Sequence, residues 1–282
     1  MIDKETLTRI FRKMCYSRYF ELEIVEAHKA KLITCPIYLS IGQEAIPATL
    51  SELTNGFTIF AQHRAHGVYV CSAKMPFKLI DELLGLSTGC NGGNGGSNML
   101  QDNDIPMIGH HGLVGENVPL AVGYALGSSK NTLCYFGDGA VEEDYVMASM
   151  GFAATHKLPI LFICTDNNLA VLTETKVRRS WEAVKVTSAY GLYSCDIYDT
   201  PEIIYEKTIE ALQFLPAFLN IRTCRHYWHV GSGQDGEPEW DSLYKLKFEL
   251  KKKNIDADRI ENEEREKVVL LWQERLQKLS KK

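Results

Sequence analysis

The fold is decided by two stretches, Thr132-Leu133-Cys134-Tyr135-Phe136-Gly137-Asp138-Gly139 and Ile160-Leu161-Phe162-Ile163-Cys164-Thr165-Asp166-Asn167-Asn168. Each begins with a short apolar run, over 132–136 and 160–164, which predicts a strand buried on both faces. Between them, four residues mark one face of a helix of about three turns: Val146, Met150, Ala153 and Ala154. Strand, helix and strand in this order predict a βαβ unit with parallel strands.

The remaining segments extend this pattern into an α/β fold, a parallel sheet flanked by helices. Small residues over 117–128 predict a helix that packs closely on the sheet, and a helix over 203–214 precedes a strand over 218–222. We expect a single domain over 1–282, with a helical N-terminal segment over 1–32 and a helical C-terminal tail over 240–282. The apolar positions that predict the two terminal helices are Leu7, Ile10, Phe11 and Met14, and Val269, Trp272, Leu276 and Leu279.

Composition excludes several classes of protein. The chain has 282 residues with 31 Lys and Arg against 36 Asp and Glu, a net charge of −5, which argues against coating nucleic acid or an anionic membrane. Apolar runs such as Leu158–Cys164 are far shorter than the roughly 18 residues of a membrane helix, and no apolar leader is visible. The eight cysteines lack zinc spacing, so we expect reduced thiols in a cytoplasmic protein.

A candidate site follows the two deciding strands. Asp138, flanked by Gly137 and Gly139, and the pair Asn167-Asn168 both stand at predicted strand ends, with Asn168 30 residues after Asp138. The carboxyl ends of parallel strands meet at one crevice, where carboxylate and amide oxygens suit Mg²⁺. The glycines admit an anion, and the helix expected after Gly139 points its positive end at it. These features predict a site for a metal-bound diphosphate.

A glycine-rich segment lies between residues 85 and 96, which hold six of the 21 glycines. It is either a flexible linker or a loop whose backbone approaches another group closely. Strongly patterned sequence on both sides, and the lack of a Ser, Pro or Lys bias, favour a structured functional loop.

Gly-Asp-Gly followed after about 30 residues by Asn-Asn resembles the thiamine diphosphate motif. The chain is similar to the alpha subunits of thiamine-diphosphate-dependent 2-oxoacid dehydrogenases of the pyruvate, branched-chain and acetoin type. Further segments resemble this family in the same order over about residues 5–235: Gly42-Gln43-Glu44-Ala45, Arg64-Ala65-His66-Gly67, Gly92–Met99, Gly112–Gly115 with Pro119 and Gly123, Lys157-Leu158-Pro159, and Thr223-Cys224-Arg225 with His229.

The resemblance assigns roles in binding the metal and the diphosphate. It implies that the side chains of Asp138 and Asn168 and the carbonyl of Ala170 hold Mg²⁺. It also implies that Arg64 pairs with the diphosphate, where guanidinium geometry suits phosphate oxygens. The other cofactor-binding positions that it implies are His63, Gly137, Gly139 and Ala140, of which Gly139 and Ala140 donate backbone N–H groups.

Further roles concern the aminopyrimidine ring and the reaction. The resemblance implies that Gly112 and Val114 contact the ring, with Val114 as an apolar wedge, and that His229 is the catalytic histidine of a mobile loop. A solvated loop histidine is the alternative for His229. Tyr38 and His63 depart from the residues usual in pyruvate-using relatives, so pyruvate itself is in doubt. The roles of Tyr38, His110 and His111 stay open.

The resemblance also implies a partner. The glutamate that activates the cofactor belongs to a second module in this family, so we expect a beta-type subunit in an α₂β₂ assembly. The expected function is decarboxylation of a 2-oxo acid with acyl transfer to a carrier, which a lipoyl acyltransferase would provide. Two alternatives stay open: a non-oxidative decarboxylase or carbon–carbon ligase of split-transketolase type, and an inactive partner-binding paralogue.

Overall fold

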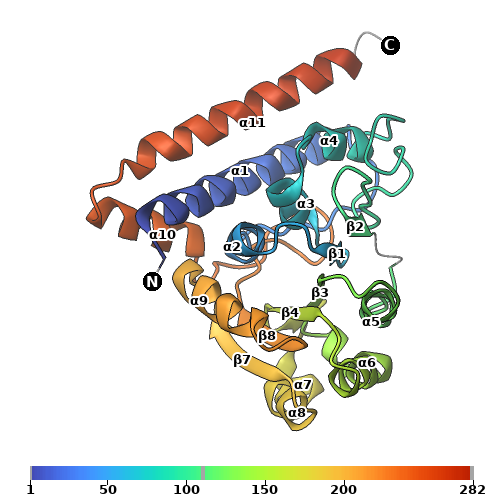
Figure 1. Cartoon of the computed structure of the whole chain (residues 1–282). Helices are drawn as coiled ribbons and strands as arrows, with labels where there is room; N and C mark the ends of the chain where they lie inside the picture. Colours follow the sequence, from blue (N-terminus) through green and yellow to red (C-terminus); the bar gives the residue numbers. More distant parts are fainter. Residues whose placement is uncertain (1, 109–111, 280–282) are drawn as a thin grey trace.

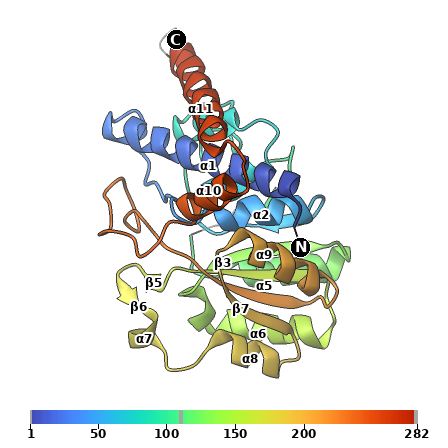
Figure 2. The same cartoon turned by 90° about the vertical axis from the view of Figure 1, so that its left-hand side faces the viewer.

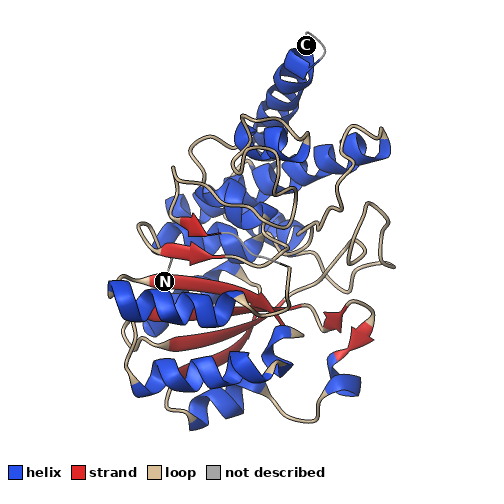
Figure 3. Cartoon of the chain, turned by 90° about the vertical axis from the view of Figure 1, so that its right-hand side faces the viewer, coloured by secondary structure: helices blue, strands red, loops and turns tan. Residues whose placement is uncertain are grey.

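The computed structural model of the chain describes residues 2–108 and 112–279. Its centre is a sheet in the order β2-β1-β3-β4-β8-β7, in which all neighbours pair in parallel (Figure 3). The strands are β1 Thr58–Phe60, β2 Met107–Ile108, β3 Thr132–Gly137, β4 Ile160–Asp166, β7 Tyr193–Tyr198 and β8 Ala217–Arg222. A small antiparallel pair, β5 Leu169–Ala170 and β6 Thr173–Glu174, follows β4. The predicted α/β class with a parallel sheet is confirmed.

Helices cover both faces of the sheet (Figures 1 and 2). The predicted βαβ unit is present, because β3 and β4 pair with each other in parallel and α6 lies between them in the sequence. The helices are α1 Lys4–Lys29, α2 Ala45–Leu53, α3 His66–Ser72, α4 Phe77–Leu83, α5 Asn117–Ser128, α6 Asp144–Thr155, α7 Thr175–Arg178, α8 Ala183–Ala189, α9 Pro201–Leu212, α10 Ser242–Lys252 and α11 Ala257–Leu279, with a 3₁₀ turn η1 over Ala140–Glu142. No described helix is both long and apolar enough to cross a membrane.

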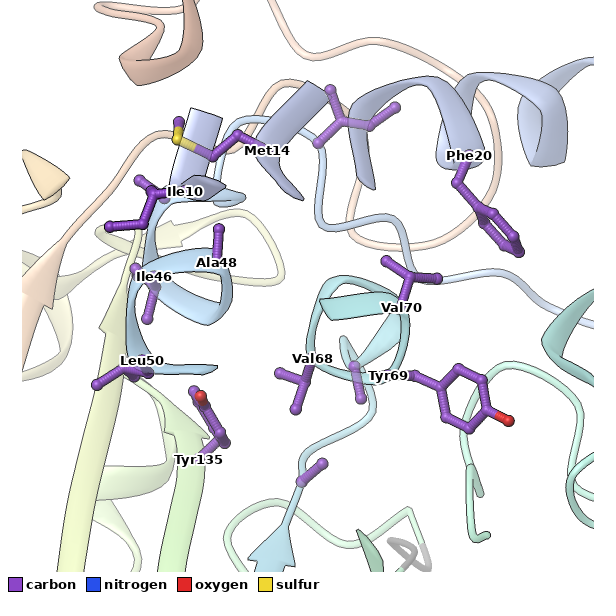
Figure 4. Close-up of a cluster of buried hydrophobic side chains, with 14 of the residues drawn as sticks. Ile10, Met14, Phe20, Ile46, Ala48, Leu50, Val68, Tyr69, Val70 and Tyr135 are labelled. Atoms are coloured by element: carbon purple, nitrogen blue, oxygen red, sulfur yellow. The ribbon is translucent and has the colours of Figure 1, made fainter. Parts of the chain in front are cut away.

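Alternate residues of the central strands serve two separate hydrophobic cores. In β3, Leu133 and Tyr135 pack with α1, α2 and α3, whereas Cys134 and Phe136 pack with α5 and α6. Figure 4 shows part of the first core, with Tyr135 below Ile46 and Leu50 of α2. This alternation is the period of a strand whose two faces are both covered, as the all-apolar runs predict.

The terminal helices lie side by side, although they are far apart in the sequence (Figure 1). The α1 helix begins where Asp3 accepts a hydrogen bond of 2.8 Å from the backbone N–H of Thr6. Trp272 of α11 is buried edge-on against Phe20 of α1, with 5.7 Å between the ring centroids. Of the positions predicted for the apolar face of α11, Trp272 is buried, whereas Val269 is only partly buried and its neighbour Val268 is buried.

Candidate functional site

A cavity lies at the carboxyl ends of β1, β3 and β4, where the strand order of the sheet brings the predicted motifs together. All the predicted site residues border it except Asn168: His63, Arg64, Gly112, Val114, Gly137, Asp138, Gly139, Ala140, Ala170 and His229. Tyr38 lies in the same wall. His110 and His111 fall outside the described residues.

Asp138 directly follows β3 and is 2% exposed. Burial is the main cause that raises the pKa of its carboxyl, and the nearby charge of Asp166 adds to it, while Arg178 opposes both. Arg178 and the hydroxyl of Thr175, at 3.4 Å, both bond to Oδ2. In the described part of the chain, Oδ1 is therefore the oxygen of Asp138 that remains for a ligand in the cavity.

The two asparagines that follow β4 border different hollows of the surface, and the assignment of Asn168 as a metal ligand stays a prediction. Asn167 borders the cavity with Asp138, whereas Asn168 borders a separate groove. Asn168 has a left-handed backbone with φ of 63°, and its Oδ1 accepts a hydrogen bond of 3.2 Å from the backbone N–H of Thr175. The chain turns at this residue, so of the two asparagines it is Asn167 that shares the cavity lining with Asp138, and its Oδ1 accepts a hydrogen bond of 3.1 Å from the backbone N–H of Leu169.

Arg64 is a buried cation that forms no ion pair with a carboxylate in the described part of the chain. Its guanidinium donates to the carbonyl oxygens of Leu39, at 2.5 Å, and His229, at 3.1 Å. No carboxylate within 2–108 or 112–279 forms an ion pair with it. Burial first, and then the charge of Arg225, lower the pKa of Arg64 to about 10, so it stays charged at neutral pH. A buried guanidinium at a cavity wall that forms no ion pair within the described residues favours an anionic ligand.

His229 belongs to a cluster of three rings. Its ring centroid lies 5.6 Å from that of Tyr38 and 5.4 Å from that of His63, and the latter two are 5.0 Å apart. Burial is the first cause that lowers the pKa of His229 to about 4, followed by the charges of Arg64 and Arg225. The imidazole is therefore neutral at pH 7, the form that accepts a proton or a hydrogen bond. The ring of His229 is half-buried in the cavity wall, which disfavours the alternative that His229 is a solvated loop histidine.

The glycines of the site allow backbone to approach closely. A Cβ on Gly139 would lie 2.9 Å from the Cβ of Ala170, so only glycine fits between the two strand ends. The segment after Gly139 differs from the prediction, since η1 follows first and the α-helix begins only at Asp144. Gly112 adopts φ of 106°, beside the half-exposed Val114.

Several polar residues border the cavity for which the sequence predicted no role in the site. Gln62 Nε2 donates to Thr165 Oγ1 at 2.7 Å, and Asn117 Nδ2 donates to the carbonyl of Tyr135 at 2.6 Å. Asn98 also borders the cavity, at the end of the glycine-rich loop. Gln62 and Asn117 belong to none of the segments that resemble the family, whereas Asn98 lies within Gly92–Met99, where the resemblance gave it no role.

The sequence of this chain is similar to those of known proteins. The model of the family described as dehydrogenase E1 component matches residues 12–197. The pyruvate dehydrogenase E1 component subunit alpha-1 of Arabidopsis thaliana, a mitochondrial protein, is 27% identical over 272 residues, 91% of this chain and 67% of that one. The pyruvate dehydrogenase E1 component subunit alpha of Rickettsia prowazekii is 28% identical over 242 residues, 80% of this chain and 73% of that one.

Solved structures show the same fold at low identity. A transketolase from Campylobacter jejuni has a TM-score of 0.56 and 16% identity, over 98% of this chain and 49% of that one. A transketolase from Leishmania mexicana has a TM-score of 0.59 and 14% identity, over 99% and 47%. This chain therefore spans about half the length of these structural relatives.

The fold, the cavity and the family match together define the class of this protein. The chain belongs to the dehydrogenase E1 component family, which confirms its resemblance to alpha subunits of thiamine-diphosphate-dependent 2-oxoacid dehydrogenases. The curated relatives described above are the alpha subunits of pyruvate dehydrogenase.

Proposed function

We propose that this chain is the alpha subunit of a thiamine-diphosphate-dependent enzyme that decarboxylates a 2-oxo acid and transfers the acyl group to a carrier. One observation carries the proposal: Asp138, Asn167 and Arg64 converge on a single cavity from three separate strand ends. Two oxygen donors and a buried cation are the groups that a metal-bound diphosphate requires.

The donor set fits Mg²⁺ better than a softer metal. Asp138 Oδ1 and the Asn167 side chain supply hard oxygen ligands, and the backbone at Leu169 and Ala170 borders the same cavity and offers a carbonyl. Among the described residues there is no group of three or more His, Cys, Asp or Glu that could hold a metal ion alone. Diphosphate oxygens and water would then supply the remaining ligands of a bound Mg²⁺, so metal and cofactor binding would be interdependent.

The remaining residues of the cavity orient the cofactor and the substrate. Thiamine diphosphate supplies the nucleophilic carbon that adds to a 2-oxo acid and the electron sink that lets carbon dioxide leave. Arg64 neutralises diphosphate charge, and the backbone N–H groups of Gly139 and Ala140 lie at the same wall. Gly112 and Val114 contact the aminopyrimidine, and the neutral imidazole of His229 accepts or relays a proton beside the substrate.

We propose a beta-type subunit as the partner, in an α₂β₂ assembly, because the activating glutamate has no matched position in this chain. Apolar side chains that lie exposed beside the cavity support a partner surface: Leu113, Val114, Val171, Leu172 and Trp228. A lipoyl acyltransferase as acceptor belongs to the same proposal. So does a cytoplasmic location, which the eight free cysteines support.

Turnover with and without a partner tests this function. Decarboxylation of a panel of 2-oxo acids, coupled to reduction of a dye, is measured for the chain alone and for the chain co-expressed with a beta-type subunit. We expect activity only in the second case. Robust turnover by the chain alone would contradict the split-enzyme proposal, and no turnover with any beta-type partner would contradict the enzymatic one.

A further inference from the structure

The glycine-rich loop is organised around a buried carboxylate on α4. Glu82 is 1% exposed, and its two oxygens accept hydrogen bonds from four backbone N–H groups of the loop. Oε2 accepts from Asn91, at 2.7 Å, and Gly93, at 2.9 Å, while Oε1 accepts from Gly95, at 2.7 Å, and Gly96, at 3.1 Å. An ionised carboxylate that accepts four N–H bonds is strongly held, because each bond is charge-assisted.

Glycine is required where the loop wraps around Glu82. Gly93 has φ of 77°, and a Cβ there would lie 2.6 Å from the carbonyl carbon of Gly85. A Cβ on Gly95 would lie 2.4 Å from the carbonyl oxygen of Met99. The glycines therefore allow the loop backbone to pack closely around the carboxylate, and do not make the segment flexible. This agrees with the prediction of a structured loop and not a linker.

The loop leads directly into a second buried network through Ser97. Ser97 Oγ accepts a hydrogen bond of 3.0 Å from the backbone N–H of Tyr38 and lies 2.7 Å from His66 Nε2. The other ring nitrogen of His66 lies 2.9 Å from Glu21 Oε1 on α1. The side chains of Ser97, His66 and Glu21 are all buried, so the end of the loop is fixed from both sides.

Two residues held by this arrangement form part of the cavity wall. Tyr38 belongs to the three-ring cluster with His229, and Asn98 directly follows Ser97. The Oδ1 atom of Asn98 is buried and has no hydrogen-bond partner in the part of the chain that the structure describes. A ligand in the cavity would meet both side chains, while Glu82 itself does not border the cavity.

We propose that Glu82 is a positioning residue for the cavity: through the four loop amides it fixes Ser97, and thereby sets where Tyr38 and Asn98 stand against the bound ligand. This inference rests on the proposed function for the identity of that ligand, thiamine diphosphate with its 2-oxo acid. The arrangement predicts that loosening the carboxylate weakens ligand binding from a distance without removing any residue that contacts the ligand.

The test compares Glu82→Gln with Asp81→Asn in the full chain, supplied with its beta-type partner. The side-chain amide introduced by E82Q keeps one acceptor oxygen and turns an NH₂ group toward two N–H donors, so at least two of the four loop bonds are lost. Asp81 is the matched control, since it is an equally buried carboxylate on α4 that binds Arg275 of α11 and, at 2.5 Å, the hydroxyl of Thr88, but none of the backbone N–H groups of residues 91–96 that Glu82 holds. Backbone amide exchange and the Kd of thiamine diphosphate with Mg²⁺ are measured for both variants.

For E82Q we expect exchange at least tenfold faster at two or more of the amides of residues 91, 93, 95 and 96, and a Kd at least tenfold weaker. D81N should lower Tm but leave both quantities within about threefold of the wild type. Faster exchange with an unchanged Kd would overturn the positioning role, and so would an equal loss of binding in D81N. Failure of the wild type to bind the cofactor would instead overturn the proposed function, before any variant is made.

A double-mutant cycle with Asn98→Ala sharpens the assignment. If Glu82 acts through Asn98, the effects of E82Q and N98A on the Kd are not additive in free energy. The Kd of the double variant should then be at most about threefold higher than that of the single variant with the higher Kd. Fully multiplicative effects would show that Glu82 does not act on the ligand through this residue, and would contradict the proposed connection.

Discussion

Replacing Asn167 with Ala tests which asparagine faces the metal. Asn167 borders the cavity with Asp138, whereas Asn168 turns toward Thr175. Removing a neutral oxygen donor from a cation costs about 1.5–3 kcal/mol, by analogy with hydrogen bonds to charged groups. Since 1.4 kcal/mol is tenfold, N167A should weaken the binding of Mg²⁺ and thiamine diphosphate roughly 10- to 150-fold.

The matched control is Asn168→Gly, because glycine keeps the left-handed backbone at φ of 63° that Ala would strain. N168G loses the bond from the backbone N–H of Thr175, yet it should change the Kd by no more than about threefold. N167A also loses the 3.1 Å bond from the N–H of Leu169 to Asn167 Oδ1, which costs about 1 kcal/mol of stability and is monitored as Tm. Isothermal calorimetry at fixed Mg²⁺ gives the two Kd values. The reasoning is refuted if N168G weakens the binding of thiamine diphosphate roughly 10- to 150-fold while N167A leaves the Kd unchanged.

Three other predictions concern stability, pH and substrate. Arg18→Ala removes the buried cation that pairs with Glu44 and, at 2.9 Å, with Asp241, so it should cost about 3–5 kcal/mol in urea unfolding; a loss below about 1 kcal/mol would contradict this. Burial and two nearby arginines lower the pKa of His229 from 6.5 to about 4, so the stability it contributes is complete above pH 6.5 and lost as the pH falls toward 4. The Tm of the wild type should therefore fall more between these pH values than that of H229Q, and parallel curves would oppose the assignment. Because Tyr38 stands in the cavity wall, a 2-oxo acid other than pyruvate should give the highest kcat/KM in a substrate panel, and the opposite ranking would refute this.

The strands β3, β4 and β8 of the central sheet could be predicted from the sequence, because local pattern and final environment agree there, whereas the short strands β1 and β2 were not predicted. The apolar runs of β3 and β4 are buried on both faces, as their composition indicates. The edge strand β7, Tyr193–Tyr198, was missed because Ser194 and Asp196 interrupt its apolar residues and it is only partly buried. The helix α2 was also missed, since Pro47 falls inside the short segment and follows residues typical of a turn; proline is tolerated there because it lies in the first turn.

The sequence motifs predicted where the site lies, but not how its individual side chains are arranged. Spacing along the chain places a polar pair after β4, yet it does not predict that Asn167 borders the cavity and Asn168 the neighbouring groove, because that division depends on the left-handed backbone at Asn168. The role of Glu82 has no local signal either. A glutamate on a short helix looks like an exposed charge until the fold brings the loop amides around it.

Metal-dependent cofactor binding by the wild-type chain is the most direct test of the proposed function. Calorimetry with thiamine diphosphate is performed on the wild-type chain assembled with its beta-type partner, in the presence of Mg²⁺ and again after chelation with EDTA. Because Asp138, Asn167 and Arg64 face one cavity, we predict saturable binding with Mg²⁺ and a loss of at least tenfold in affinity without it. Equal binding under both conditions, or none under either, would contradict the assignment of this cavity as the site of a metal-bound diphosphate.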